Sequence, residues 1–140
     1  MKLIHRTDTE IIMVNANFEK EEYEILANFP FSSDSKRMGI VLKNKTFGHI
    51  IFYLKGAENV VEKFVKEKYK GYIKENAENL AMAGLRTLVL TQKLLSQEEF
   101  DEWKSEYHEA FGVFKLITLP PGMYLFLICC CACSLSVKAY

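Results

Sequence analysis

Three short clusters in this sequence combine residue types that can hold a ligand. An aromatic ring can stack on a flat base, a glycine lets other groups approach the backbone closely, and an arginine fork matches two anionic oxygens. Each cluster offers at least one of these groups. They are Phe31-Ser32-Ser33-Asp34-Ser35-Lys36-Arg37-Met38, Lys55-Gly56-Ala57-Glu58 and Gly84-Leu85-Arg86-Thr87-Leu88.

Each cluster also has an ordinary structural explanation. Phe31 suits a hydrophobic core, and Lys36 with Arg37 suits a solvated surface. Lys55-Gly56 can simply end a strand, and Arg86 can cap the last carbonyls of a helix. No cluster taken alone therefore defines a site.

The elements that must position these clusters change type near Ala57. Residues 10–56 predict strands separated by turns, because short apolar runs alternate with turn residues. Strands are expected at Arg37–Leu42 and His49–Lys55, joined by the hairpin loop Lys43–Gly48. Pro30 is expected at a strand end or edge, where the backbone bends.

After Ala57 the apolar residues recur at helical spacing, and Gly84 is the expected helix stop. Thr87–Gln92 predicts a strand. Ser96 and Glu99 form a capping box that opens a further helix. The fold class is therefore α/β (α+β), an antiparallel β-sheet flanked by two or three helices. The apolar residues of the helices are Val60, Val61, Phe64, Val65, Tyr72, Ile73, Ala77, Leu80, Ala81, Phe100, Trp103, Tyr107 and Phe111.

Length and composition limit the function classes. A chain of 140 residues predicts one domain. Eighteen Lys plus Arg balance eighteen Asp plus Glu, so a nucleic-acid partner is not expected. The first ten residues lack the apolar core of a signal peptide. All four cysteines lie within residues 129–133, which favours a reducing, cytosolic compartment for the rest of the chain.

The order and spacing of the clusters carry a resemblance. From about His5 to about Phe111 the sequence resembles the nucleotide-binding (N) domain of P-type ATPases. Its Phe-Ser/Thr-Ser-x-x-Lys-Arg-Met, Lys-Gly-Ala-Asp/Glu and Gly-Leu-Arg-Thr-Leu motifs match the three clusters in order. The run Lys36-Arg37-Met38-Gly39 resembles the phospholipid flippases, and the longer stretch 29–39 is most similar to their endosomal and Golgi subgroup.

The resemblance implies that ATP is the ligand and assigns roles to seven residues. Phe31 stacks on adenine, Lys55 lines the adenine pocket, and Gly56 leaves room for the purine. The ribose and phosphates are held by Ser33, Lys36 and Arg86, with Thr87 in the same motif as Arg86. The parent would be a phospholipid-translocating pump of endosomal or Golgi membranes, with its other domains and the phospholipid as partners and Mg²⁺ required only in the full-length protein.

The resemblance also implies what this chain does not carry. The family's phosphorylated aspartate lies in an Asp-Lys-Thr-Gly-Thr motif, and Thr-Gly-Asp and Gly-Asp-Gly-x-Asn-Asp motifs hold magnesium. None of these occurs in the sequence, so we expect no catalytic residue and no activity from the fragment alone. Residues 1–112 are expected to be a partial domain, incomplete at its N-terminus, in a cytosolic part of a membrane protein.

Residues 113–140 are expected to lie outside the family as an apolar, cysteine-rich tail. Met123–Val137 is shorter than the ~20 residues that span a bilayer comfortably. Three interpretations stay open: a segment from a truncated gene product, an acylated tail that anchors the chain to a membrane, or a metal site. The last is disfavoured because the Cys-x-x-Cys at Cys130–Cys133 has no second ligand pair, so no metal ligands are assigned.

An alternative from another functional class is a non-nucleotide α/β interaction module. In that case Lys36, Arg37 and Arg86 are surface charges, and Phe31, Lys55 and Arg86 need not share a cleft. In the nucleotide-binding interpretation these three side chains are expected to converge. A non-functional truncated product is a further alternative.

Overall fold

The computed structural model describes residues 2–111, 124–131 and 134–139. The strands are β1 (Lys2–Arg6), β2 (Glu10–Val14), β3 (Lys20–Ser32), β4 (Arg37–Asn44), β5 (Ile50–Gly56), β6 (Arg86–Leu95), β7 (Tyr124–Cys131) and β8 (Ser134–Ala139). The helices are α1 (Glu58–Val61), the 3₁₀ helix η1 (Glu62–Phe64), α2 (Glu67–Met82) and α3 (Gln97–Phe111). None of the helices in these described ranges has the length and apolar character required to cross a lipid bilayer.

The strands are hydrogen-bonded to one another in chain order, from β1 to β8. Neighbours are antiparallel, as in β2–β3, where Ile11 lies opposite Tyr23, and in β6–β7, where Leu88 lies opposite Ile128. The predicted antiparallel sheet with flanking helices is therefore confirmed. Strand β1 was not predicted, because all five of its residues are exposed and no apolar alternation marks it.

The described residues form two compact units. The first takes them from Met1–Asn28, Ile40–Phe52 and Leu94–Thr118, and the second from Phe29–Gly39, Tyr53–Lys93 and Leu119–Tyr140. The largest fully buried apolar side chains of the first unit are Phe52 and Val41. The buried apolar residues of the second unit are Leu54, Val61, Val65, Ile73, Ala77 and Val89.

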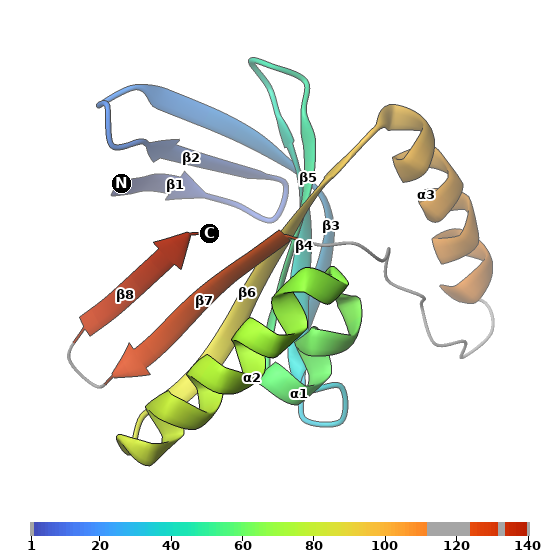
Figure 1. The fold of residues 1–140 in the computed structure, drawn as a ribbon. Helices are drawn as coiled ribbons and strands as arrows, with labels where there is room; N and C mark the ends of the chain where they lie inside the picture. The colour runs from blue at the N-terminus through green and yellow to red at the C-terminus, as the bar shows by residue number, and fades with distance from the viewer. Residues whose placement is uncertain (1, 112–123, 132–133, 140) are drawn as a thin grey trace. The chain divides into compact units, whose positions relative to one another are not determined.

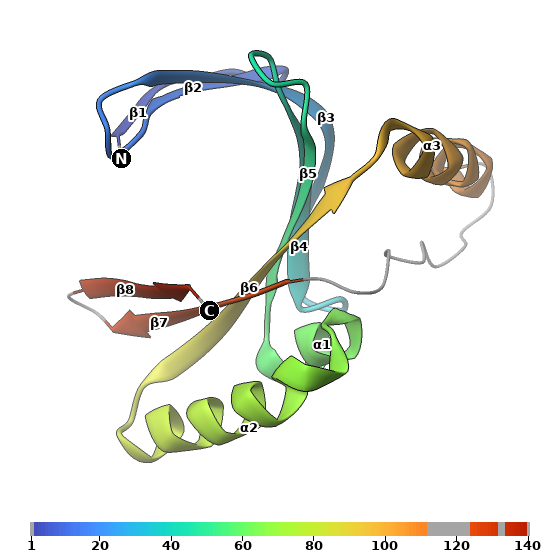
Figure 2. The same ribbon diagram turned by 45° about the horizontal axis from the view of Figure 1, so that its top comes forward.

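Helix α2, with 16 residues, is the longest helix in the second unit. Figures 1 and 2 both show it running alongside β6. Its buried residues, Ile73 and Ala77, lie four positions apart and therefore on one face of the helix. In the sheet beside it, the buried Thr91 hydroxyl of β6 donates a hydrogen bond to the carbonyl oxygen of Leu54 at 3.3 Å. This bond satisfies a polar group that burial would otherwise penalise.

Helix α2 ends at Met82, and Gly84, the stop that the sequence predicts, follows its C-cap Ala83. The Gly84 amide donates to the carbonyl of Ala81, and the Leu85 amide donates to the carbonyl of Leu80, both at 2.9 Å. This pair of bonds is the Schellman arrangement, in which the residue after the C-cap takes a left-handed conformation. Gly84 has φ = 74°. Because the chain reverses there, β6 begins two residues later, at Arg86.

Two further local predictions are confirmed. The hairpin loop between β4 and β5 comprises residues 45–49 and overlaps the predicted Lys43–Gly48 in all but its last residue. The capping box at α3 is complete: the Glu99 amide donates to Ser96 Oγ at 3.1 Å, and the Ser96 amide donates to Glu99 Oε2 at 3.0 Å. Two orphan donors at the start of the helix are thereby satisfied reciprocally.

Strand β3 is longer than the sequence suggested, with 13 residues. Pro30 lies inside it, two positions before its end at Ser32. Strand β2 pairs with residues 20–24 of β3, so Pro30 lies beyond the paired stretch. A residue without an amide hydrogen is tolerated where a strand has no partner on one side.

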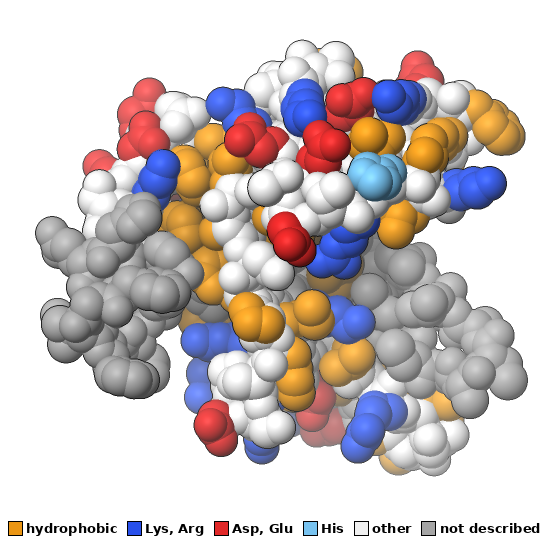
Figure 3. Space-filling view, turned by 180° about the vertical axis from the view of Figure 1, so that it is seen from behind, with side chains coloured by type: hydrophobic (Ala, Val, Ile, Leu, Met, Phe, Trp, Pro, Cys, Tyr) orange, Lys and Arg blue, Asp and Glu red, His pale blue; other side chains and the backbone are white. Residues whose placement is uncertain are grey.

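Several predictions fall outside the described residues. They concern the boundary at residues 112–113, the turn at Pro120-Pro121-Gly122 and the side chains of Tyr107 and Phe111. The surface charges of the described residues are mixed in sign. Figure 3 shows acidic and basic side chains interspersed on the face that it draws, and Lys45 Nζ lies 2.9 Å from Glu10 Oε2 and 3.8 Å from Glu22 Oε2.

Candidate functional site

A pocket of about 1010 Å³ lies within the second unit. This volume is at the upper end of the range of about 300–1,000 Å³ that is usual for ligand sites. Its walls come from the end of β3, the β3–β4 turn, the segment from Ala57 to Glu62, helix α2 and the start of β6. The lining residues are Phe31, Lys36, Ala57, Glu58, Asn59, Glu62, Ile73, Lys74, Ala77, Glu78, Ala81, Leu85, Arg86, Thr87 and Leu88.

Four of the seven site residues predicted from the sequence line this pocket. They are Phe31, Lys36, Arg86 and Thr87. Ser33, Lys55 and Gly56 are not among its lining residues. The expected convergence of Phe31 with Arg86 is therefore present in the geometry, and Lys36 joins them, whereas Lys55 does not.

Phe31 and Lys36 are brought to the pocket by the turn between β3 and β4. The Lys36 amide donates to the Ser32 carbonyl at 2.9 Å, and the Ser35 amide donates to Ser32 Oγ at 3.1 Å. These two bonds close the turn, so the side chains before and after it lie near each other. Phe31 is 60% exposed, which leaves its ring accessible to a ligand.

Lys36 adopts a left-handed backbone conformation, with φ = 50°. Residues other than glycine adopt this conformation at an energetic cost. Such residues concentrate at functional sites, where the surrounding structure holds them in place. The carbonyl of Lys36 is held by the amide of Ala57, which donates to it at 3.2 Å.

Strand β5 ends against this turn. Burial alternates along the strand, so Lys55 lies on the opposite face from the buried Leu54 and Gly56. A Cβ atom added to Gly56 would lie 2.7 Å from the Lys36 carbonyl oxygen and 2.9 Å from Arg37 Cβ. The backbone of β5 therefore approaches the turn more closely than any side chain at position 56 would permit.

Arg37 follows Lys36 but makes a different contact. Its guanidinium carbon lies 4.8 Å from the centroid of the Phe64 ring, within the range of a cation–π interaction. Burial lowers the pKa of the Arg37 guanidinium, because removal from water disfavours the charged form. The paired cations of the sequence motif thus separate: Lys36 lines the pocket, and Arg37 packs on an aromatic ring.

Arg86 and Thr87 reach the pocket because α2 ends sharply. The turn at Gly84 directs the chain into β6, and Leu85 to Leu88 all line the pocket. Arg86 is exposed, so its guanidinium is free of the packing that holds Arg37. An exposed arginine at a pocket wall can form paired hydrogen bonds to anionic oxygens.

The sequence interpretation missed the polar residues that α2 and the segment before it contribute. Lys74 and Glu78 lie one position after Ile73 and Ala77, so they border the buried stripe of α2. Their position beside the apolar stripe of the helix was the sequence signal that could have identified them. With Glu58 and Glu62, the pocket carries three carboxylates and three cations, the latter being Lys36, Lys74 and Arg86.

This arrangement can bind a ligand that has a flat apolar part and an anionic part. The Phe31 ring and the aliphatic residues of α2 and β6 suit the former, and the cations suit the latter. Within the described residues, no group of three or more His, Cys, Asp or Glu side chains is placed to hold a metal ion.

A family model described as "P-type ATPase, cytoplasmic domain N" matches residues 2–115. The chain therefore belongs to the family of P-type ATPase N domains, as the order of its three motifs predicts. The match covers every residue that lines the pocket.

Curated relatives narrow the family to its phospholipid-transporting branch. "Probable phospholipid-transporting ATPase IIB" of Danio rerio is 36% identical over 110 residues, or 79% of this chain and 10% of the relative. "Probable phospholipid-transporting ATPase tat-5" of Caenorhabditis elegans is 36% identical over 107 residues, 76% of this chain and 10% of the relative. "Phospholipid-transporting ATPase NEO1" of Saccharomyces cerevisiae is 41% identical over 88 residues, which are 63% of this chain and 8% of the relative.

The predicted resemblance to this branch is confirmed by these relatives. The chain spans about a tenth of the length of the curated relatives that it matches. The region shared with these relatives is therefore the N domain.

Proposed function

We propose that this N domain binds ATP in the pocket of its second unit. The observation that carries the proposal is the convergence of Phe31, Lys36, Arg86 and Thr87 on one pocket, although they come from separate parts of the sequence. An aromatic ring and two cations from different elements are the groups that a nucleotide requires. An interaction module has no need for them to share a pocket.

In this proposal Phe31 stacks on the adenine, and Lys36 and Arg86 bind the phosphates. Ser33, in the β3–β4 turn, and Thr87, beside Arg86, supply hydroxyl groups for the ribose and phosphates. Lys55 does not line the pocket, and in this proposal it contributes positive charge from the end of β5. Gly56 does not line the pocket either, and its backbone lies against the Lys36 carbonyl.

The proposal extends to the parent protein. There the domain delivers ATP to a P-type ATPase that moves phospholipid in endosomal or Golgi membranes. Mg²⁺ and the phosphoryl transfer belong to the remaining pump domains. The relatives are named as phospholipid-transporting ATPases, and this supports the assignment of the substrate class.

The test is an ATP titration of the 140-residue chain followed by NMR, with Phe31→Ala and Phe47→Ala variants beside it. Phe47 is a matched control, since it is an exposed phenylalanine (69%) outside the pocket. Loss of a stacking ring costs about 1–3 kcal/mol. Phe31→Ala is therefore expected to weaken ATP binding by about fivefold or more, whereas Phe47→Ala leaves it unchanged.

Saturable shifts that centre on the pocket residues and weaken in Phe31→Ala would support the proposal. A folded chain whose spectrum ignores millimolar ATP would overturn it for this chain. The interaction-module alternative would then be preferred.

A further inference from the structure

Gly56 is the residue of the second unit whose missing side chain matters most to the geometry beside the pocket. Its added Cβ atom would meet the Lys36 carbonyl oxygen at 2.7 Å and Arg37 Cα at 3.1 Å. These are backbone atoms, so they cannot swing aside as the end of a flexible side chain can. By contrast, a Cβ atom added to Gly71 in α2 meets nothing within 4 Å.

Gly56 approaches the backbone of Lys36, which is held by two hydrogen bonds. The Lys36 amide donates to Ser32 within the turn, and the Lys36 carbonyl accepts from Ala57, which directly follows Gly56. Between these two bonds Lys36 holds its left-handed conformation. Displacement of the end of β5 would therefore move the backbone from which the Lys36 side chain extends into the pocket.

We propose that Gly56 is a positioning residue for phosphate recognition: its bare Cα lets the end of β5 seat on the Lys36 carbonyl, and this contact aims the Lys36 ammonium into the pocket. The inference rests on the proposed nucleotide function and deepens it. Gly56 itself does not line the pocket, so it acts through Lys36 and not by contact with the ligand. Adenine stacking on Phe31 does not depend on it.

The proposal separates the two halves of the ligand. A Gly56→Ala variant should lose affinity for ATP, which carries the phosphates, and keep its affinity for adenosine, which lacks them. Loss of one charge-assisted hydrogen bond predicts an ATP affinity about tenfold lower. Adenosine affinity should change less than about twofold, and Gly71→Ala, the matched control, should change neither.

The experiment titrates ATP and adenosine into the full chain and the Gly56→Ala, Lys36→Ala and double variants. If both changes act on one contact, the double variant loses no more ATP affinity than Lys36→Ala alone. Equal losses for ATP and adenosine would overturn the proposal, because they would place position 56 against the purine. Unchanged ATP affinity in Gly56→Ala would overturn it as well.

A second readout needs no nucleotide and keeps this inference separate from the proposed function. In the free chain, Gly56→Ala should shift the Lys36 and Arg37 amide resonances and speed hydrogen exchange at the Ala57 amide. If the wild-type chain does not bind ATP, the proposed function fails. The Lys36 and Arg37 amide resonances then test the positioning role of Gly56 by themselves. Resonances that do not change in Gly56→Ala would overturn that role.

Ala57→Pro tests the same contact from the other side if Gly56→Ala does not fold. Ala57 has φ = −64°, which a proline adopts without strain. The substitution removes the amide that donates to the Lys36 carbonyl. It should reproduce the selective loss of ATP affinity, and retention of wild-type ATP affinity would overturn the proposal.

Discussion

The two tight turns that flank β4 solve the same geometric problem with different residues. The β3–β4 turn places Lys36 in the left-handed region, with φ = 50°, and the β4–β5 turn places Gly48 there, with φ = 71°. Gly48 has open space where a Cβ would lie. The β4–β5 turn therefore uses the residue that adopts this conformation without cost, and the β3–β4 turn does not.

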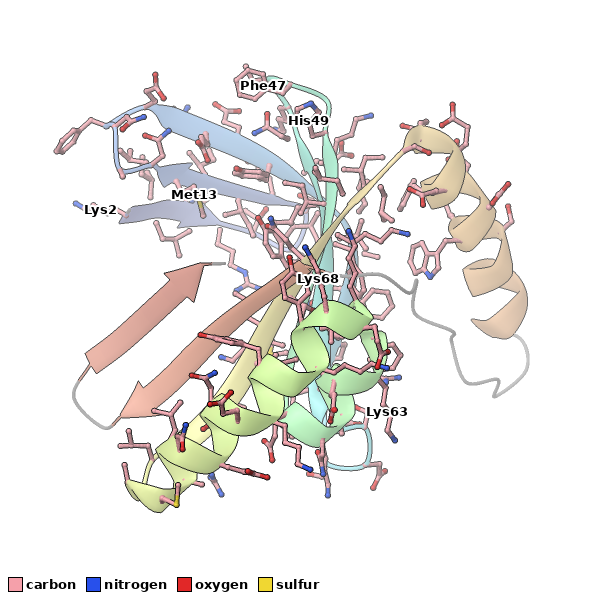
Figure 4. All side chains as sticks on the ribbon, in the orientation of Figure 1. Lys2, Met13, Phe47, His49, Lys63 and Lys68 are labelled. Atoms are coloured by element: carbon pink, nitrogen blue, oxygen red, sulfur yellow. The ribbon has the colours of Figure 1, made fainter. Side chains whose placement is uncertain are left out.

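The two turns also differ in the side chain that accepts hydrogen bonds from their backbone amides. At the β4–β5 turn the buried Asn44 side chain accepts from the amides of Thr46 and Phe47 at 2.8 and 2.9 Å. At the β3–β4 turn the corresponding acceptor, Ser32 Oγ, is exposed and takes one amide, that of Ser35. Figure 4 shows the tip of the β4–β5 turn, where Phe47 and His49 lie side by side. Their ring centroids are 6.1 Å apart.

The difference indicates that the β4–β5 turn is built for stability and the β3–β4 turn for its side chain. A glycine at position 36 would relieve the backbone but remove a cation from the pocket. Strain that persists at a site in this way supports a functional role for the residue that carries it.

The largest effect is expected from Asn44→Ala. The substitution leaves the amides of Thr46 and Phe47 without their acceptor, and Asn44 itself is buried. We expect a loss of about 2 kcal/mol in the free energy of unfolding, measured by urea denaturation. Thr46→Ala, at the exposed tip of the same turn, is the control and should change little. Equal losses in both variants would contradict the stabilising role assigned to Asn44.

Gly48→Ala should have a smaller effect. A side chain at φ = 71° costs about 1–2 kcal/mol, although no atom obstructs it. Gly48→Asn should cost less, since asparagine tolerates the left-handed region. Thermal unfolding of the two variants checks the order. A larger loss in the asparagine variant would mean that something other than backbone conformation fixes Gly48.

Lys36→Gly should have the smallest effect on stability and, unlike the two substitutions above, should stabilise the fold. Relief of the left-handed lysine, offset by the entropy of glycine, should raise the free energy of unfolding by about 0.5 kcal/mol. ATP affinity should fall about tenfold with the lost cation. Lys36→Arg keeps the charge and should keep both properties. A destabilised Lys36→Gly variant would show that the two turns do not differ as described.

The parts of the fold that the sequence predicted well are those specified by local chemistry. The Ser96 capping box and the Gly84 stop depend on residues within a few positions of each other, and both were identified correctly. The Lys43–Gly48 loop was found for the same reason. Strand β1 was missed because an exposed strand carries no apolar alternation, and the length of β3 was missed because Pro30 suggested an earlier end.

The candidate site was predictable as a set of motifs but not as a geometry. Sequence order indicated Phe31, Lys36 and Arg86, which line one pocket. It did not reveal that Lys36 is left-handed, since lysine has no preference for that region. The contact of Gly56 with Lys36 joins segments 20 residues apart, and only the pairing of strands in the sheet brings them together.

The regular alternation along β5 has a consequence for the gene. Buried and half-buried residues follow one another from Ile50 to Gly56 without interruption. One added codon within this stretch would exchange the faces of every residue beyond it, so that Lys55 would take a buried place. Two added codons would restore the original faces. Tolerance of this segment to insertions should therefore depend on whether the number of added codons is odd or even.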